Sequence, residues 1–173
     1  VAVLTSLGRP ILYKQERVGL DGRPFQILKF RTMRPPNPSA DNVIALAPRD
    51  TAPGGVEGQD RRTRVGTLLR RTSVDELPQL VNVLKGEMSL IGPRPERPEF
   101  ARLFAARVDR YAERHRVKSG ITGWAQVHGL RGKTSLSDRV EWDNYYIENW
   151  SLWLDFKILI LTVAAVVRPG RVE

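Results

Sequence analysis

Three prolines fall within six residues of the stretch IGPRPERPEF, residues 91–100. Each proline ring fixes φ at about −65° and removes a backbone N–H, and it also disfavours helical backbone in the preceding residue. Neither an α-helix nor an inner strand can run through such a segment, so we expect a stiff, extended connection. Arg94 lies between two of these prolines, which predicts that its backbone is held firmly. The fold must therefore place separate elements before and after residues 93–98.

The N-terminal part of the chain has the signature of a β-hairpin. Residues 11–18 and 24–32 are strand-like runs with Asp21-Gly22 between them. Asp-Gly favours a tight hairpin turn because glycine tolerates positive φ. Residues 33–60 are rich in Pro, Gly, Asn and Asp and have no periodicity, which indicates a long loop. That composition is compatible with a lid, a binding loop or disorder.

Helical spacing of apolar residues dominates the rest of the chain. Residues 63–84 show it with an interruption at Pro78, which predicts two helices that meet near two adjacent acids. Residues 96–118 predict one long amphipathic helix, and residues 136–148 and 150–167 predict two more. The apolar stripe of the long helix favours packing against a core over facing a membrane, and consists of Phe100, Leu103, Phe104, Val108, Tyr111 and His115. The predicted fold class is α+β, mostly helical with a small N-terminal β-hairpin.

The charge of the chain points to an anionic partner. Lys and Arg total 28 against 19 acids, which gives a net charge of +9. Nucleic acid, acidic lipid headgroups and phosphorylated small molecules all fit that balance. The chain has no cysteine, which excludes disulfides and thiol chemistry. The longest apolar run, residues 158–167, is too short to span a bilayer, although Trp150 and Trp153 before it suit a membrane interface as well as a core.

The adjacent acids Asp75 and Glu76 have an ordinary structural explanation. Ser73 and Glu76 match a capping box, but Pro78 would then remove a bond inside the helix. A helix capped by Asp75 instead places the proline in the first turn, where no bond is lost. Local rules therefore account for the pair without any chemistry.

The surrounding arginines support a catalytic alternative. Arg70 and Arg71 precede the acids, and the stiff Arg94 follows. The planar guanidinium fork suits phosphate groups. We expect nearby positive charge to lower the pKa of Asp75 and keep it ionised, as a nucleophile toward phosphorus requires. Glu76 could hold Mg²⁺, which prefers oxygen ligands and often bridges carboxylates to substrate phosphates.

Other chemistries have little support. His115 and His128 lack the closely spaced partners of a zinc site, and we predict that both are structural. Neither the G-x-x-x-x-G-K-[ST] phosphate loop nor the G-x-S-x-G nucleophile elbow is present.

Five strings resemble those of the bacterial sugar transferase family, the monotopic polyprenyl-phosphate glycosyl-1-phosphate transferases. They are YKQERVG, FQILKFRTM, RRTRVGTLLRRTSVDELPQLVNVLKGEMSLIGPRPE, SGITGWAQVHGLRGKT and WDNYYIENWSLWLDFKIL. The resemblance implies transfer of a sugar-1-phosphate from a nucleotide diphosphate sugar, such as a UDP-hexose, to polyprenyl phosphate, usually undecaprenyl phosphate. It places the reaction at the cytoplasmic face of the bacterial cytoplasmic membrane. There it would initiate a membrane glycan such as an exopolysaccharide, a capsule or an O-antigen.

The resemblance also assigns roles to individual residues. It makes Asp75 of the DELPQL string the nucleophile that forms a covalent aspartyl intermediate, and Glu76 the Mg²⁺ ligand. The residues that it implies for substrate phosphate contacts are Arg70, Arg94, Asp143 of WDNYY, and Lys29 and Arg31 of KFRTM.

The domain organisation follows from the same resemblance. Residues 1–10 match the end of a re-entrant membrane segment, residues 11–168 the catalytic domain, and residues 169–173 a tail. The catalytic domain is expected to associate with an anionic membrane surface through basic helix faces and the Trp-flanked apolar run. A homo-oligomer is compatible with the sequence.

Two rival hypotheses remain open. A basic nucleic-acid-binding module is supported by net charge alone, because no recognised nucleic-acid motif backs it, so we predict no nucleic-acid partner. A scaffold homologue without catalysis is disfavoured by the intact DELPQL and PRP strings.

Overall fold

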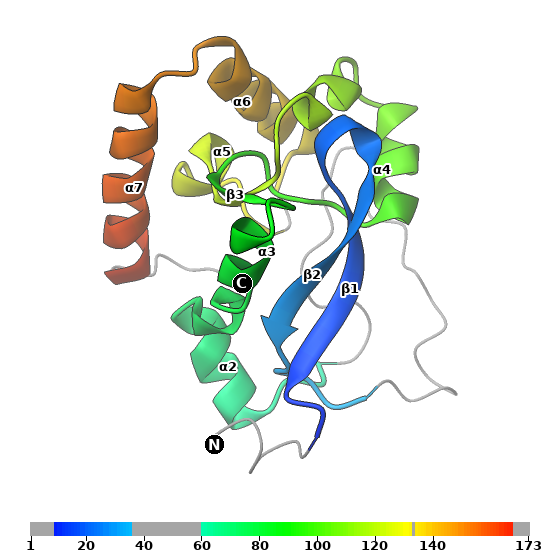
Figure 1. Ribbon diagram of the computed structural model, residues 1–173, viewed down its shortest axis with the longest axis vertical. Helices are drawn as coiled ribbons and strands as arrows, with labels where there is room; N and C mark the ends of the chain where they lie inside the picture. The colour runs from blue at the N-terminus through cyan, green and yellow to red at the C-terminus, as the bar shows by residue number, and fades with distance from the viewer. Residues whose placement is uncertain (1–8, 36–59, 133, 168–173) are drawn as a thin grey trace.

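The computed structural model describes residues 9–35, 60–132 and 134–167 (Figure 1). The described part is a mixed α/β fold with a two-stranded sheet near its N-terminal end, in agreement with the predicted hairpin. The elements in chain order are β1 (Leu12–Val18), η1 (Leu20–Gly22), β2 (Pro24–Phe30), α2 (Arg64–Arg71), η2 (Val74–Glu76), α3 (Gln79–Leu84), β3 (Ser89–Ile91), α4 (Pro98–Ala105), η3 (Tyr111–His115), β4 (Gly120–Thr122), α5 (Trp124–Val127), α6 (Leu136–Glu148) and α7 (Leu152–Val167). The predicted membrane remnant, loop and tail lie mostly or wholly outside the described residues.

The hairpin forms where the Asp-Gly signal predicts it. Strands β1 and β2 pair antiparallel in a register that sets Leu12 opposite Phe30 and Val18 opposite Pro24. Asp21 and Gly22 both have positive φ, 53° and 74°. Positive φ at two successive turn residues matches the twist of the flanking strands, which is why this dipeptide closes the hairpin. The ribbon then runs along one side of the molecule, with α4 beside its turn end (Figure 1).

A short parallel pair of strands, β3 and β4, was not predicted. Ser89 pairs with Gly120, and Ile91 with Thr122. The two backbones come so close that a Cβ at Gly120 would lie 2.1 Å from the Gly92 nitrogen. Each strand has only three residues and glycines adjoin them, so no alternating pattern marks them in the sequence.

The prediction of one long helix over residues 96–118 is wrong. Helix α4 ends at Ala105, the chain reverses through Arg110 with a φ of 59°, and η3 follows. The apolar stripe survives this break because both pieces face the same core. Phe104 meets Tyr111 edge-on, with ring centroids 5.7 Å apart, inside a cluster that also holds Val18 from the hairpin. The expectation of a core-facing stripe is therefore confirmed, although its helical continuity is not.

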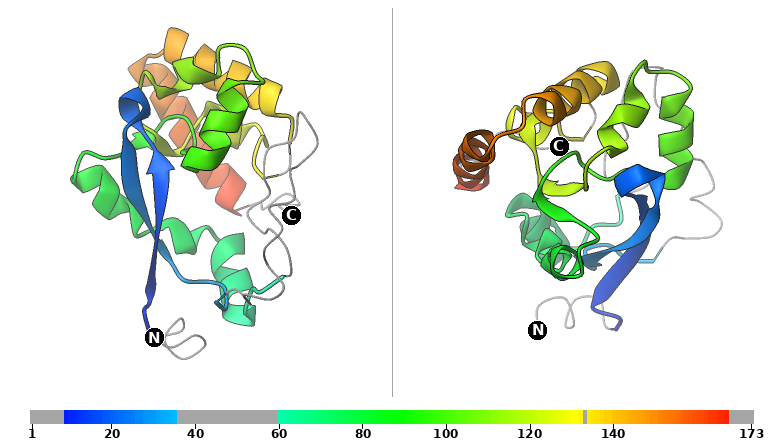
Figure 2. Two further views of the ribbon diagram at one scale, coloured as in Figure 1. Left: turned by 90° about the vertical axis from the view of Figure 1, so that its right-hand side faces the viewer. Right: turned by 45° about the horizontal axis from the view of Figure 1, so that its top comes forward.

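Helices α6 and α7 have the predicted positions, but α7 is mostly uncovered. Its Ile158 is fully buried against Ile91 and Tyr146, whereas Leu152, Trp153 and Val163 are more than 60% exposed. Figure 1 and the right-hand view of Figure 2 show α7 at the outer edge of the molecule. Among the described helices, none combines the length and the apolar composition needed to cross a membrane.

Candidate active site

A hollow of about 930 Å³ lies between the hairpin, the α2–η2 turn and the Pro-rich segment. Eleven Lys or Arg side chains line it against three acids, Asp75, Glu76 and Glu96. So uneven a lining gives the hollow a strongly positive potential, which attracts anions such as phosphates. The predicted site residues Lys29, Arg31, Arg70 and Arg94 are all part of this wall.

The two acids lie in a short 3-10 turn rather than at a helix cap. Ser73 has a φ of 55° and makes no side-chain cap hydrogen bond, and α3 begins after Pro78. Both capping explanations are therefore wrong for this structure. The turn directs Asp75 and Glu76 into the same hollow, where their surroundings differ.

Glu76 is held by two cations. Its Oε1 accepts hydrogen bonds from Lys29 Nζ at 2.8 Å and from Arg94 Nη2 at 2.7 Å, and its side chain is 12% exposed. Burial alone would raise the pKa of Glu76, but Arg94 and Lys29 outweigh it and hold that pKa well below its usual range. Glu76 is therefore a fixed negative charge that ties β2 to the Pro-rich segment.

Asp75 has the opposite environment. It is 6% exposed, and within the described ranges its carboxylate makes no hydrogen bond and no ion pair. Burial and the neighbouring Glu76 raise the pKa of Asp75 above its ordinary value, although Lys29, Arg70 and Arg94 oppose them. The expectation of a lowered pKa is therefore wrong, because burial and the charge of Glu76 outweigh the three cations.

Arg70 reaches the hollow because α2 approaches the end of β2 closely. Its Nε donates to Thr32 Oγ1 over 3.0 Å. The approach needs a glycine, since a Cβ at Gly66 would lie 2.0 Å from the Thr32 carbonyl oxygen. Thr63 caps α2 by accepting from the Gly66 N–H. These contacts set the last turn of α2, and with it Arg70, beside the acids.

The Pro-rich segment is extended as predicted, and its carbonyl groups fix it. Prolines remove N–H donors, so the segment can be anchored mainly through its oxygens. Four consecutive carbonyls, from Pro93 to Glu96, accept in turn from Gly120 N, Arg114 Nη2, Arg17 Nη1 and Val18 N over 2.9–3.2 Å. Arg94 is thereby held on its backbone while its guanidinium also reaches Gln126 Oε1 at 3.3 Å.

The structure does not place Asp143 with the other predicted site residues. It lies on α6, is 2% exposed and forms a buried ion pair with Arg114. It is absent from the wall of the hollow. Arg31 is on the wall and partly buried.

Sequence reasoning did not assign seven of the eleven basic residues of the wall to the site, among them Arg131 and Arg139. Arg131 belongs to a Gly-rich stretch that reads only as a turn, and Arg139 reads as one exposed charge on a helix. Arg139 is in fact 2% exposed and bridges Glu96 Oε1 at 3.0 Å to the carbonyl of Gly132 at 2.8 Å. It therefore anchors the loop that carries Arg131. No signal in a single sequence marks either residue.

The carboxylate oxygens of the hollow are of the ligand type that Mg²⁺ prefers. The residues that the structure describes hold no group of three or more His, Cys, Asp or Glu side chains around a common point. Mg²⁺ commonly uses only one or two carboxylates and takes its other ligands from substrate phosphates and water. In the described part of the chain, Glu76 Oε2 accepts one long hydrogen bond, over 3.4 Å from Arg94 Nη1, so it is the less engaged oxygen of this carboxylate.

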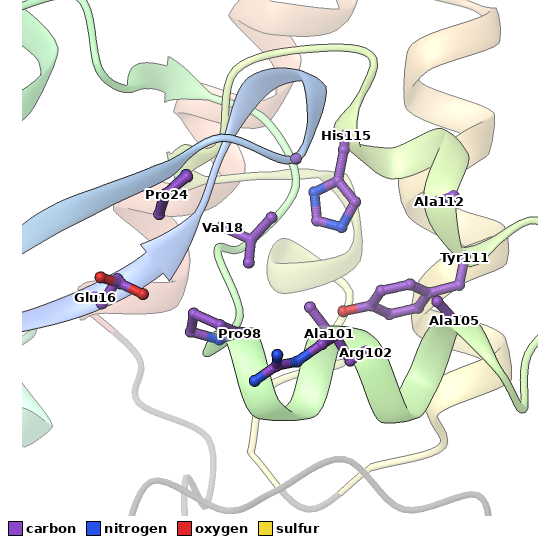
Figure 3. Close-up of a pocket in the computed structure, with 11 residues that line it drawn as sticks. Glu16, Val18, Pro24, Pro98, Ala101, Arg102, Ala105, Tyr111, Ala112 and His115 are labelled. Atoms are coloured by element: carbon purple, nitrogen blue, oxygen red, sulfur yellow. The ribbon is translucent and has the colours of Figure 1, made fainter.

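A second, smaller pocket of about 350 Å³ lies away from the acids, between the hairpin turn, α4 and η3 (Figure 3). Tyr111 and His115 line it among mainly apolar walls. Burial lowers the pKa of His115 to about 4, so its ring is neutral at physiological pH. It packs edge-on against Tyr111, while His128 packs between Trp124 and Trp142. Both histidines serve packing, as predicted.

Comparison with known proteins identifies the family of this chain. The profile of the family described as "Bacterial sugar transferase" matches residues 1–169. A UDP-glucose:undecaprenyl-phosphate glucose-1-phosphate transferase of Xanthomonas campestris pv. campestris is 42% identical over 96% of this chain and 34% of its own length. A protein of the same name from Caulobacter vibrioides is 47% identical over 91% of this chain and 57% of its own length. A UDP-N-acetylgalactosamine-undecaprenyl-phosphate N-acetylgalactosaminephosphotransferase of Aeromonas hydrophila is 42% identical over 91% of this chain and 36% of its own length.

The chain belongs to the bacterial sugar transferase family, which confirms the resemblance drawn from its motifs. It spans between about a third and just over half of the length of these three relatives.

Proposed function

We propose that this chain transfers a sugar-1-phosphate from a UDP-hexose to undecaprenyl phosphate through a covalent bond to Asp75. The observation that carries the proposal is the contrast between two adjacent acids in one basic hollow. Within the described residues Glu76 is ion-paired and has a depressed pKa, whereas Asp75 makes no ion pair and has a raised pKa. Such divergence separates a reacting carboxylate from one that supplies charge. The names of the relatives support the two substrates.

The first half of the reaction uses Asp75 as nucleophile. A carboxylate oxygen of Asp75 attacks the phosphorus that bears the sugar and forms a new P–O bond. The bond from that phosphorus to the bridging oxygen breaks, and nucleoside monophosphate leaves with the electron pair. Arg70, Arg94 and Arg131 are placed on the wall to stabilise charge on the phosphoryl oxygens and on the leaving group.

The second half restores the enzyme. An oxygen of polyprenyl phosphate attacks the same phosphorus, and the bond from phosphorus to Asp75 breaks. The product is a polyprenyl diphosphate sugar, and Asp75 returns to a carboxylate. Because the nucleoside monophosphate has left, the same basic wall can receive the phosphate of the acceptor. The reaction is therefore ping-pong.

Mg²⁺ is the cofactor that suits this site. Glu76 Oε2 would hold it, together with oxygens of the substrate diphosphate. When bound, the ion neutralises charge that develops on the leaving nucleotide. Lys29 and Arg94 keep Glu76 ionised for this role, because both lower its pKa.

A lipid acceptor agrees with the exposed apolar surface near the acids. Helix α3 is inverted in polarity: Gln79 and Asn82 are at most 1% exposed, whereas Leu84 is 87% exposed. Leu77, just before this helix, is 53% exposed. Leu77 directly follows Glu76, so the apolar surface begins at the edge of the hollow. We place this face and α7 against the cytoplasmic leaflet of the bacterial cytoplasmic membrane, where basic residues near the surface add attraction.

A donor panel tests the proposed function. Purified protein is incubated with Mg²⁺, undecaprenyl phosphate and each of several UDP-sugars, and released UMP is measured. We expect one or a few donors to release UMP and Asp75→Asn to release none. Full turnover by Asp75→Asn would refute the nucleophile. Tight, salt-dependent binding to DNA without UMP release from any donor would favour the nucleic-acid alternative.

A further inference from the structure

We infer that Asp143 is a positioning residue, which acts through Arg114 on the backbone of Arg94 and does not contact the substrate. The inference rests on the proposed function, which it deepens by assigning the support of a phosphate-binding arginine. A carboxylate is also a poor ligand for a phosphate, because like charges repel. The buried position of Asp143 gives it a different task.

Asp143 and Arg114 form a closed unit in the interior. Arg114 Nη2 and Nε donate to Asp143 Oδ2 over 2.6 and 3.1 Å, and the two side chains are 1% and 2% exposed. Arg114 Nη1 donates to the Tyr111 hydroxyl over 3.2 Å. Two bonds from one guanidinium to one carboxylate oxygen, and a third to a phenol, leave Arg114 little freedom to rotate.

The remaining contact of this unit leads to the hollow. Arg114 Nη2 also donates to the Arg94 carbonyl over 3.1 Å. Proline rings on both sides of Arg94 stiffen its backbone, so a carbonyl held in place also fixes the base of the side chain. At the other end of that side chain, Nη2 lies 2.7 Å from Glu76 Oε1. Charge-assisted hydrogen bonds therefore connect α6, through Arg114 and Arg94, to Glu76.

The adjacent residue on α6 provides a matched control. Asn144 is 3% exposed, and its Nδ2 donates to the carbonyl of Arg110 over 3.1 Å. Asn144 thus resembles Asp143 in two ways: it lies on α6, and it is equally buried. It also anchors a backbone carbonyl. The carbonyl that it holds belongs to the chain reversal before η3 and has no bond to the Pro-rich segment. Asn144→Ala should therefore destabilise the fold without a specific effect on the site.

A double-mutant cycle separates positioning from general stability. We expect Asp143→Asn to lower kcat for UMP release on the order of 10- to 100-fold with a smaller change in KM, because a misplacement of about 1 Å is enough for such a loss. In an Arg94→Lys background, Asp143→Asn should cost no more than about a further 3-fold, because residues that act as a unit are not additive. Asn144→Ala should change kcat by less than about 2-fold in both backgrounds. If Asp143→Asn lowers kcat by the same factor in the Arg94→Lys background as in the wild type, the inference is overturned.

A second variant and a second readout keep the test decisive. If Asp143→Asn does not fold, Tyr111→Phe removes only the hydroxyl that supports Arg114, and it should show the same coupling to Arg94→Lys at smaller size. If the wild-type protein releases no UMP from any donor, the proposed function fails. The positioning is then read from nitrogen-15 arginine NMR, with the Arg94 Nε signal assigned by its loss in Arg94→Lys. Asp143→Asn should shift or broaden that signal and Asn144→Ala should not; an unchanged signal in Asp143→Asn would refute the inference.

Discussion

Replacement of the two adjacent acids, one at a time, should change stability in different directions. Glu76→Gln removes the negative charge that faces Lys29 at 2.8 Å and Arg94 at 2.7 Å, in a site where the glutamate side chain is 12% exposed. Breaking a buried ion pair by removal of one partner costs about 3–5 kcal/mol. In a chain of this length each kcal/mol lowers Tm by about 2–4 °C, so Glu76→Gln should lower Tm by about 6–20 °C.

Asp75→Asn should not destabilise the fold at pH 7. The Asp75 carboxylate accepts no hydrogen bond within the described part of the chain, so the change breaks none there. Folding raises the pKa of Asp75, which means that its ionised form is less stable in the folded chain than in the unfolded chain. Removal of that charge should leave Tm unchanged or raise it.

Thermal unfolding followed by circular dichroism tests both expectations. The folded pKa of Glu76 is depressed, so its contribution is complete above its unfolded value of about 4.3 and is lost as the pH falls through the folded value. The Tm gap between wild type and Glu76→Gln should therefore be full at pH 7 and should narrow below about pH 4. Equal losses of Tm in both variants at pH 7 would refute the contrast between the two acids.

Three further perturbations test other parts of the account. Lys29→Met removes a charge that lowers the pKa of Asp75. The acid limb of the pH–rate profile for UMP release should therefore move to higher pH. An acid limb at the same or a lower pH would contradict this. Gly66→Ala places a Cβ 2.0 Å from a backbone oxygen, so it should displace α2. The rate of UMP release should then fall by about 10-fold or more. A normal rate would show that α2 need not approach β2. Leu84→Asp should weaken sedimentation of the protein with vesicles of anionic phospholipid. The control Ala106→Asp makes the same change in charge at an exposed site and should not weaken it. Equal weakening in both variants would show that α3 is not part of the membrane face.

Sequence patterns predicted those elements whose cause is local. Asp21-Gly22 marks the hairpin because the turn needs two positive φ values. Ser135 accepts from the Asp138 N–H and starts α6 at the predicted residue. The error over residues 96–118 has a local cause as well, because Val108 and Tyr111 continue the helical spacing of α4 across a break that only the reversal at Arg110 reveals.

The electrostatics of the site could not be predicted in the same way. The sequence placed arginines near both acids and suggested that Asp75 has a low pKa. The deciding contacts join Glu76 to Lys29, 47 residues before it, and to Arg94, 18 residues after it. Only the fold shows that these cations form their ion pairs with Glu76 and not with Asp75. The motif around Asp143 likewise suggested a substrate contact. Only the fold shows that the charge of Asp143 faces Arg114 in a buried ion pair.

The most direct test of the central claim is intact-protein mass spectrometry after a single-turnover incubation. Wild-type protein is mixed with Mg²⁺ and its preferred UDP-sugar, without any polyprenyl phosphate, and digested to locate the modified residue. We expect release of UMP in an amount close to that of the enzyme, with sugar-phosphate attached to Asp75 and lost when undecaprenyl phosphate is added. An enzyme that releases UMP only when both substrates are present, and that never carries the group on Asp75, would contradict it.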